Sequence, residues 1–596
     1  MEFITQNFVL LLFAGLLAFL LSGFPVAFSL AATGLTFGLI GMEAGLFPPT
    51  LFQALPLRVF GIMQNDTLLA VPFFTFMGIV LERSGMAEDL LETVGQVFGP
   101  LRGGLALATI FVGALLAATT GVIAAAVISM GLISLPIMLR YGYNRSIASG
   151  VIIASGTLAQ IIPPSLVLIV MADQVGRSVG DMYAGAVVPG LLLVGLFALF
   201  IAILAVVRPS WVPALPAEAL IYKEPNGASG HRSLLVLLVL SIAAAFAWAG
   251  LHDTIVNPLV GRVGAAPTDE VLTLSTTAAA FFALALALLN RLFRFGLLSR
   301  LTERVVFVLL PPLVLIFLVL GTIFIGVATP TEGGAMGAVG ALVMAVSRRR
   351  LSFDLLKQAL DNTAKLSCFV MFILIGATVF SFTFNAADGH LWVEHLFAKL
   401  PGGQLGFLIA VNLLVFILGC FIDFFEIAFI VIPLLAAVAD KMGIDLIWFG
   451  VMIGMNLQTS FLSPPFGFAL FYLRSVAPRN DYTDRVTNKR TPGVTTAQIY
   501  KGAFVFIILQ LVMLAVVIAH PKLITGRIDK APAVDLESIK LEAEKGGYGP
   551  QEEPQKAFAP QPAGGKGEPP AASAGPAEED PMEAVKRALE QDAKKK

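Results

Sequence analysis

The sequence predicts an all-α polytopic membrane protein with an inverted repeat, two re-entrant helical hairpins and two broken helices. Of the 596 residues, 57% are hydrophobic and only 13% are charged. A spanning helix needs about 20 mostly apolar residues, so the long apolar runs predict roughly twelve crossings besides the hairpins. The dipeptide Pro163-Pro164 inside one apolar stretch recurs as Pro464-Pro465 inside another, 301 residues later. This recurrence indicates an internal repeat.

The same offset relates other helix-breaking positions without a gap. It places Pro100 on Pro401 and Gly142 on Gly443. The alternative is coincidence in a membrane chain that contains many Pro and Gly residues, and the single shared offset argues against it. Broken apolar segments in corresponding positions of two halves are typical of secondary transporters, whose binding site lies at the interface of the repeats.

The repeat and the composition divide the chain into seven sections. They are, in order, N-terminal scaffold helices with an interfacial arm (1–66), a first repeat with a hairpin and a broken helix (67–180), a linking helix plus inserted helices (181–304), scaffold helices with a second arm (305–363), a second repeat with a hairpin and a broken helix (364–480), a C-terminal helix (481–529) and a disordered tail (530–596). The tail consists mainly of Ala, Pro, Gly, Glu and Lys, which cannot bury enough apolar surface to offset chain entropy.

The scaffold is predicted from the apolar helices that precede each repeat unit. Residues 8–42 are typical of two helices, and 46–63 of an amphipathic arm along the membrane interface. In the second half, 305–346 are typical of two helices and 352–362 of the matching arm, followed by a crossing at 364–386.

An insertion without a counterpart in the repeat separates the two halves. It comprises helices near 234–250 and 271–292, joined by a polar loop that holds His252, Asp253 and Asp269.

Two apolar stretches that are interrupted near their middle predict the hairpins. The stretch 105–140 is interrupted at Thr119-Thr120-Gly121, and 405–441 is interrupted at Cys420–Asp423. Lys and Arg stay on the cytoplasmic side of a membrane protein. The arginines that share one side when the crossings alternate are Arg140, Arg145, Arg208, Arg291, Arg294, Arg300, Arg304, Arg348, Arg349, Arg350, Arg474 and Arg479. The first hairpin then opens from the cytoplasm and the second from outside, as an inverted repeat requires.

Two further stretches predict the broken helices. Residues 146–175 are interrupted at Ser155-Gly156-Thr157 and at the first proline pair, and 446–476 at Asn456–Ser460 and at the second pair. An unpaired backbone group in hydrocarbon costs several kcal/mol, so non-helical backbone survives at membrane depth only inside protein or beside a cavity.

The breaks predict ion and substrate sites. Half-helix N-termini carry partial positive charge and suit a carboxylate, whereas free carbonyls and hydroxyls suit Na⁺. The residues predicted to bind Na⁺ or substrate are Thr119, Thr120, Gly121, Ser155, Gly156, Thr157, Pro163, Pro164, Asp423, Asn456, Thr459, Ser460 and Pro464. The alternative is that the small polar residues only allow close helix packing.

Acidic residues inside membrane segments are costly and indicate function. Asp423 and Glu426 lie at the second hairpin break, and Glu332 lies in the sequence Thr329-Pro330-Thr331-Glu332. For Thr329, Thr331 and Glu332 we weigh a transport role against a helix-start role, because Thr caps, Pro suits the first position and a carboxylate favours the first turn.

The sequence carries no enzyme signature. The five histidines show no metal-ligand spacing and are expected in loops or at helix ends, and there is no phosphate-binding P-loop or Gly-x-Ser-x-Gly motif. The sequence therefore predicts a protein that is not an enzyme, uses no cofactor and binds no nucleic acid. Without a P-loop, an ion gradient must supply the energy for transport.

At these motifs the sequence resembles the large membrane subunit of TRAP (tripartite ATP-independent periplasmic) transporters. The resemblance spans about 8–520, and the length and the insertion resemble the longer branch of that family. The segments that carry it are Asn65–Phe74 (NDTLLAVPFF), Ser155–Ser165 (SGTLAQIIPPS), Thr329–Glu332 (TPTE), Gly443–Gly450 (GIDLIWFG) and Asn456–Gly467 (NLQTSFLSPPFG).

The resemblance implies partners and a mechanism. Family members work with a small four-helix membrane subunit and a periplasmic substrate-binding protein, and they import organic acids with Na⁺ by an elevator movement. The family's first hairpin tip, often Ser-Gly-Ser-Ser, falls on Thr120-Gly121-Val122-Ile123, where two hydroxyls are missing. The second tip keeps the family's Asp as Asp423, but Phe424 and Phe425 replace smaller residues.

The leading hypothesis is therefore a multi-pass permease subunit of the bacterial cytoplasmic (inner) membrane that imports small organic anions (carboxylates) with Na⁺ as the coupling ion and with a binding protein. A channel or exporter that works without a binding protein is the alternative, and an intramembrane enzyme is the third reading. A neighbouring gene for a binding protein or a small four-helix protein would separate the first from the others.

Overall fold

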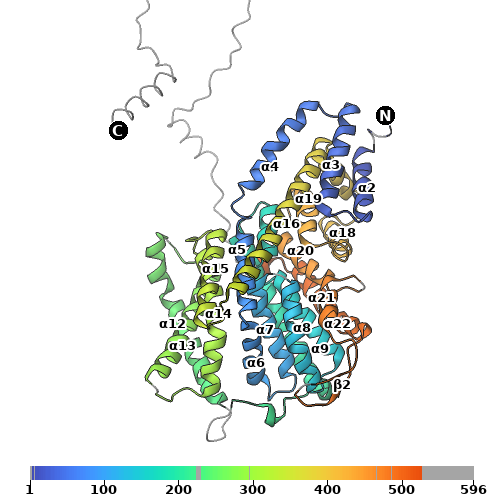
Figure 1. The fold of residues 1–596 in the computed structure, drawn as a ribbon. Helices are drawn as coiled ribbons and strands as arrows, with labels where there is room; N and C mark the ends of the chain where they lie inside the picture. Colours follow the sequence, from blue (N-terminus) through green and yellow to red (C-terminus); the bar gives the residue numbers. More distant parts are fainter. Residues whose placement is uncertain are drawn as a thin grey trace, which may run out of the picture. The chain divides into compact units, whose positions relative to one another are not determined.

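The computed structural model describes residues 3, 5, 7–121, 123–222, 230–262, 264–293, 295–464, 466–484 and 486–526 (Figure 1). Residues 1–529 form one compact unit. The predicted tail, 530–596, lies outside the described residues.

The described elements are helical apart from one small antiparallel sheet. In chain order they are α2 (Phe8–Leu21), α3 (Val26–Glu43), η1 (Pro49–Ala54), α4 (Leu55–Met63), α5 (Ala70–Arg83), α6 (Met86–Phe98), α7 (Gly104–Thr120), α8 (Ile123–Arg140), α9 (Arg145–Thr157), η2 (Leu158–Gln160), α10 (Leu166–Gln174), α11 (Val179–Val207), η3 (Pro209–Trp211), η4 (Ala217–Ala219), α12 (His231–Val260), α13 (Thr268–Phe293), α14 (Arg300–Phe324), α15 (Pro330–Ser347), α16 (Phe353–Ala386), α17 (Gly389–Ala398), α18 (Gly403–Leu418), α19 (Phe424–Lys441), α20 (Leu446–Ser460), α21 (Phe468–Val476), β1 (Tyr482–Thr483), β2 (Arg490–Thr491), α22 (Thr496–Ala519) and α23 (Lys522–Thr525).

Within the described residues, eight helices are long and apolar enough to cross a membrane, or nine if one bent pair counts as a single span. They are α3, α8, α11, α12, α13, α14, α16 and α22. This is fewer than the roughly twelve crossings expected from apolar length. The broken helices contribute to the difference, because their parts α9, α10, α20 and α21 have only 9 to 15 residues each and are too short to span alone.

The helix bounds follow the sequence repeat. Shifted by 301 residues, α8 falls on 424–441, the bounds of α19, and the start of α9 falls on the start of α20. The N-caps also correspond: Asn144 accepts from the first-turn amides of α9, and Asp445 accepts from those of α20. Gly142 and Gly443, which end the preceding helices, both have positive φ, 80° and 72°, a conformation that Gly adopts without steric cost.

The helices that precede the repeat units pack across the two halves. Helix α3 packs along α16, and its counterpart α15 packs along α5. A Cβ on Gly34 of α3 would lie 2.7 Å from the carbonyl oxygen of Val379, and one on Gly376 of α16 would lie 2.4 Å from that of Ala27. Small residues therefore let these two backbones approach closely.

The second arm differs from its prediction. The segment expected as a separate arm and the crossing after it are one continuous helix, α16, of 34 residues. In the first half, Thr50–Met63 and Asp66–Arg83 meet at a 44° bend. At that bend the side chain of Asn65 accepts from the backbone amides of Thr67 and Leu68. The residue at the corresponding position of α16 is Leu366, which cannot make this turn.

The insertion forms α12 and α13, which pack on each other, and α13 packs on α14. His252, Asp253 and Asp269 were expected in the connecting loop, but the first two lie inside α12 and Asp269 lies inside α13. The prediction was wrong because His252 is fully buried and bonds Glu270 over 3.0 Å, which lets the helix continue past it. Arg262 lies 2.8 Å from the other carboxylate oxygen of Glu270.

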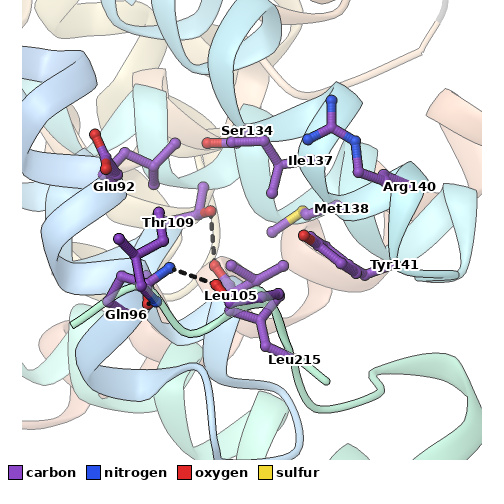
Figure 2. Close-up of a pocket in the computed structure, with 14 residues that line it drawn as sticks. Glu92, Gln96, Leu105, Thr109, Ser134, Ile137, Met138, Arg140, Tyr141 and Leu215 are labelled. Atoms are coloured by element: carbon purple, nitrogen blue, oxygen red, sulfur yellow. Dashed lines mark hydrogen bonds between the residues drawn. The ribbon is translucent and has the colours of Figure 1, made fainter. Parts of the chain in front are cut away.

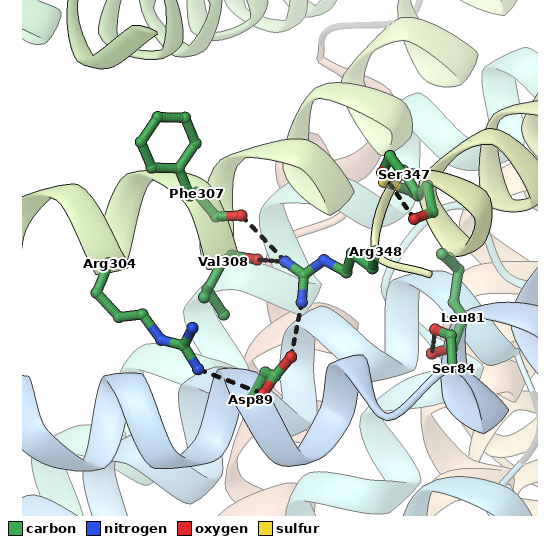
Figure 3. Close-up of polar contacts among 9 residues, drawn as sticks. Leu81, Ser84, Asp89, Arg304, Phe307, Val308, Ser347 and Arg348 are labelled. Carbon is green, nitrogen blue, oxygen red and sulfur yellow. Dashed lines mark hydrogen bonds and ion pairs between the residues drawn. The ribbon is translucent and has the colours of Figure 1, made fainter. Parts of the chain in front are cut away.

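A carboxylate between two arginines joins α6 to the scaffold helices (Figure 3). Arg348, which follows α15, donates to Asp89 over 2.8 Å and to the carbonyl oxygens of Phe307 and Val308. Arg304 of α14 donates to the other carboxylate oxygen of Asp89 over 3.4 Å. The network therefore fixes one end of α6 against α14 and α15.

A second ion pair fixes the end of α8. Arg140, the last residue of this helix, makes a bidentate contact with Asp484, whose side chain is 5% exposed. Asp484 lies in the loop between β1 and β2 and also accepts from the backbone amide and the hydroxyl of Thr487. The loop after α21 is thereby tied to the base of α8.

We expect Asp89→Ala to destabilise the protein. The change leaves Arg348 without its carboxylate partner, and hydrogen bonds to charged groups contribute about 1.5–3 kcal/mol each. Thermal unfolding in detergent should show a lower melting temperature for this variant. Glu88→Ala is the matched control, because Glu88 lies in the same first turn but is exposed; equal losses in the two variants would contradict the assignment.

The ion pair between Asp484 and Arg140 should make the stability of the fold depend on pH at acidic pH. Hydrogen bonds from Arg140 and Thr487 lower the pKa of Asp484 from 3.8 to about 2. A lowered pKa in the folded state stabilises the fold above pH 3.8, and this contribution disappears as the pH falls through about 2. The melting-temperature difference between wild type and Asp484→Asn should stay constant from pH 7 to about 4 and shrink toward pH 2.

The control for this series is Asp481→Asn, because the Asp481 side chain is 45% exposed and pairs with an arginine that is 80% exposed. Exposed ion pairs contribute little, so this variant should match wild type across the series. A difference for Asp484→Asn that has already vanished at pH 5 would contradict the pairing.

Candidate functional site

Four interruptions separate short helices inside the apolar part of the chain. They lie between α7 and α8, between α9 and α10, between α18 and α19, and between α20 and α21. The breaks predicted at Pro163-Pro164 and at the second proline pair are confirmed at Pro163, Pro164 and Pro464. The additional interruptions predicted at Ser155-Gly156-Thr157 and Asn456–Ser460 are wrong, because these residues are helical and each break begins just after them. Small polar residues can stay in a helix when their hydroxyls bond the preceding turn, whereas Pro removes a donor and disfavours helix in the residue before it.

The breaks enclose a cavity of about 170 Å³. The residues that line it come from all four interruptions and from α16. They are Gly121, Ile123, Ala124, Gln160, Leu166, Val167, Leu366, Asp423, Phe424, Phe425, Phe461, Phe468 and Tyr472. Segments more than 300 residues apart in the sequence therefore share one cavity.

Four helices begin at this cavity. The first two residues of α8, of α10 and of α19 line it, and so does the first residue of α21. The first amides of a helix have no partner within the helix and carry the positive end of its dipole. Converging N-termini therefore form a positive environment without a cationic side chain, which suits an anion.

Gln160 provides a second sign of a ligand site. Its side chain lines the cavity and is only 1% exposed. Neither its amide nitrogen nor its amide oxygen makes a hydrogen bond within the described part of the protein. Buried polar groups are almost always paired, so a free buried amide indicates a partner such as a ligand or water.

Asp423 places a carboxylate at the same cavity, as the N-cap of α19. Its backbone amide donates to the carboxylate of Glu426 over 3.0 Å, which supports the start of the helix. Glu426 itself is 8% exposed. An anion bound in the cavity would face the charge of Asp423 unless a cation lay between them.

A polar contact joins the two repeats behind the cavity. Gln458 Nε2 of α20 donates to Thr157 Oγ1 of α9 over 3.4 Å, and these residues are 301 positions apart. The two residues therefore occupy equivalent positions in the two repeats. A contact between equivalent positions lies at the axis that relates the two halves. Gln510 of α22 also donates to Thr157 Oγ1, over 3.5 Å.

A larger cavity, of about 210 Å³, lies between α6, α7, α8 and the segment 215–221 (Figure 2). Two of the polar side chains that line it, Gln96 and Arg140, already have partners within the protein. Gln96 donates to Ala219 and accepts from Ile221, and Arg140 is bound to Asp484. The smaller cavity, with its free Gln160, is therefore the stronger candidate for a ligand site.

A comparison with known families agrees with this architecture. The family model described as "Tripartite ATP-independent periplasmic transporter, DctM component" matches residues 13–523. The chain belongs to this family. It is the large permease subunit of a TRAP transporter.

Three relatives show the breadth of the TRAP family. The C4-dicarboxylate TRAP transporter large permease protein of Pseudomonas aeruginosa is 28% identical over 72% of this chain and 82% of its own length. The sialic acid TRAP transporter large permease protein of Vibrio cholerae is 24% identical over 78% of this chain and 88% of its own. The ectoine TRAP transporter large permease protein of Halomonas elongata is 24% identical over 80% and 92%. These relatives are transporter permeases and not enzymes, in agreement with the sequence analysis.

Among the predicted site residues of this TRAP subunit, Gly121 and Asp423 line the cavity. Thr119 and Thr120 end α7, but their side chains lie outside the described part. Pro163, Pro164 and Pro464 lie in the breaks, and Val122 and Pro465 are outside the described residues.

The predicted hydroxyls do not line the cavity. Ser155, Thr157, Thr459 and Ser460 are fully buried, and each hydroxyl donates to a carbonyl three or four residues earlier in its own helix. Asn456 donates to the carbonyl oxygen of Asn412 in α18 over 2.6 Å. Thr157 Oγ1 already accepts from Gln458 and Gln510, so it can bind a cation only if one of these amides moves away. The hydroxyl oxygens of Ser155, Thr459 and Ser460 keep lone pairs for a cation.

Thr329, Thr331 and Glu332 make the contacts of a helix start. Thr329 caps α15. The backbone amide of Thr329 donates to the carboxylate of Glu332 over 2.8 Å, which completes a capping box. Thr331 donates to the carbonyl oxygen of Asp66, next to the bend before α5. These contacts support the helix-start alternative for Glu332.

Gln160, Phe461, Phe468 and Tyr472 line the cavity but were not predicted as site residues from the sequence. Gln160 was visible as a polar residue three positions before the first proline pair. Phe461 and Phe468 gave no signal, because aromatic residues are common in apolar membrane segments.

Gly156 should prove to be a packing residue. A Cβ at this position would lie 2.4 Å from Val127 Cγ2 and 3.1 Å from the Val127 backbone nitrogen in α8. Overpacking costs typically 1–3 kcal/mol, so Gly156→Ala should lower the melting temperature. Gly195→Ala is the control, because a Cβ there meets nothing within 4 Å, and it should be neutral or stabilising since Ala favours helix. A Gly156→Ala protein of unchanged stability would refute the packing role.

Proposed function

We propose that this TRAP large permease subunit imports a small organic anion coupled to Na⁺, by an elevator movement of the domain that holds both hairpins. The convergence of four helix N-termini on one cavity carries the proposal. Helix N-termini bind carboxylates through free amides and the helix dipole. The relatives named for C4-dicarboxylate and sialic acid transport support an anionic substrate for this chain.

The charge of Asp423 supports a coupling cation. A substrate anion in this cavity would be repelled by the carboxylate at short range, where little water screens the charges. Na⁺ bound near Asp423 would cancel the repulsion, so cation and anion would bind together. Such mutual dependence is the thermodynamic basis of symport.

Two Na⁺ sites are proposed, one at each pair of breaks. The first comprises 119–121 with 155–157, and the second 420–423 with 456–460. Hard cations prefer oxygen ligands, which backbone carbonyls at helix ends and the hydroxyls of Thr157 and Thr459 supply. The corresponding helix bounds of the two halves support sites that are related by the repeat.

The inverted orientation of the hairpins 105–140 and 405–441 is also a proposal. It is supported by the arginines that flank the first hairpin and by the shared offset of α8 and α19. The packing of α3 on α16 and of α15 on α5 gives two similar helix pairs that could form a fixed scaffold.

We further propose that a small four-helix membrane subunit and a periplasmic substrate-binding protein complete the transporter in the bacterial inner membrane. Membership of a tripartite family supports both partners. A channel or exporter that works without a binding protein is the alternative function.

Reconstitution decides between these functions. Proteoliposomes that contain the permease and its small subunit should accumulate a carboxylate only when the binding protein and an inward Na⁺ gradient are both present. Robust saturable uptake by the large subunit alone would overturn the proposal in favour of the alternative.

The Na⁺ sites predict a shift in Na⁺ dependence. Thr157→Val and Thr459→Val remove an oxygen at nearly constant volume, so the Na⁺ concentration for half-maximal uptake should rise severalfold while the protein still assembles in the membrane. Thr322→Val is the control, because this hydroxyl is also bonded to its own helix but lies in α14. An unchanged half-maximal Na⁺ concentration in both site variants would sink the ion-site proposal.

A further inference from the structure

The cavity at the breaks has an apolar wall that the transport of anions does not require. Its aromatic residues are Phe424, Phe425, Phe461, Phe468 and Tyr472. The described residues that line it include no Lys, Arg or His. The polar side-chain groups there are the amide of Gln160, the carboxylate of Asp423 and the hydroxyl of Tyr472. A ligand that fits this cavity is therefore apolar over most of its surface.

The aromatic side chains support one another. Phe461 and Phe468 lie on the two sides of the break between α20 and α21, and their rings pack edge to face with centroids 5.5 Å apart. Phe424 and Phe425 have centroids 5.1 Å apart, and Phe425 stacks on Phe429. Such ring pairs have preferred geometries, so the wall keeps its shape.

The polar groups suffice for one carboxylate. The amide of Gln160 and the first amides of α8, α10, α19 and α21 supply donors. Asp423 repels an anion unless a cation intervenes. The second carboxylate of an extended dicarboxylate would lie against phenyl rings, and burying an unpaired charge in such surroundings is strongly unfavourable.

The size of the cavity limits the apolar part of the substrate. An apolar cavity of about 150 Å³ in a protein accommodates benzene. At about 170 Å³, this cavity has room for a single ring, or a branched chain of similar size, with one carboxylate.

Resting on the proposed import function, we propose that the permease takes a small monocarboxylate whose body is one aromatic ring or a branched aliphatic chain. The carboxylate lies at Gln160 and the helix N-termini. The apolar body lies among Phe424, Phe461 and Phe468, which act as specificity-determining residues.

Direct binding tests this assignment without the binding protein, which makes its own selection. The purified complex of permease and small subunit is dialysed to equilibrium against radiolabelled phenylacetate or succinate, in Na⁺ or in choline. We expect Na⁺-dependent binding of phenylacetate that is at least tenfold tighter than that of succinate.

Substitutions in α21 test which residues determine the preference for phenylacetate over succinate. Phe468→Ser removes a ring from the wall and should reduce the phenylacetate-to-succinate ratio at least fivefold. Phe468→Leu keeps an apolar side chain and should retain most of the ratio, which separates a contact with substrate from a loss of folding. Phe471→Ser is the matched control, because Phe471 lies on the same helix but is 54% exposed, and it should leave the ratio unchanged.

The outcomes distinguish this inference from the function on which it rests. Na⁺-dependent succinate binding as tight as that of phenylacetate overturns the substrate class and leaves Na⁺-coupled anion import standing. An equal change of the ratio in Phe468→Ser and Phe471→Ser overturns the role of the wall. Failure of the folded complex to bind any carboxylate in a Na⁺-dependent manner, together with absent uptake, overturns the proposed function itself.

Discussion

A helix that ends inside an apolar environment leaves up to four backbone amides or carbonyls without partners, and hydrocarbon offers none. This chain ends or begins helices at four such places. The breaks can be stable only if their free groups share a protected polar space. The cavity that Gly121, Gln160, Asp423 and Phe461 line brings all four breaks to one place. The same requirement that stabilises the breaks thus creates a site with four helix N-termini, one carboxylate and no cationic side chain among the described lining residues.

The repeat determines how this convergence is achieved. Because Thr157 contacts its own counterpart Gln458, the two broken helices meet at the axis that relates the halves. The scaffold pairs are exchanged in the same way, since a helix of each half packs on the other half. The two halves are unequal where chemistry differs: the first tip has Gly121 at positive φ, whereas the second has Asp423 as a helix cap. The carboxylate at the cavity is therefore supplied by the second repeat.

Ion pairs at the ends of helices complete the framework. Asp89 joins α6 to α14 and α15, and Asp484 joins the loop after α21 to the end of α8. Neither group lines the cavity between the breaks. These ion pairs fix helix ends that lie away from the cavity. The other ends of these helices, or the helices next to them, form the site, so the ion pairs help to position the wall of the cavity.

The sequence by itself determined the class of the protein, its family and the apolar segments in which its helices break. Hydrophobic runs and helix-breaking residues act locally, so Pro163-Pro164, Pro464 and the offset of 301 residues were enough for these predictions. It did not determine the exact break positions, because Ser155–Thr157 and Asn456–Ser460 remain helical through bonds within their own helices. The site residue Gln160 and the aromatic wall were decided only by the tertiary structure. Which side chain of a helix faces a shared cavity depends on how four helices from distant parts of the chain pack together. A local sequence pattern therefore cannot predict which residues line the cavity.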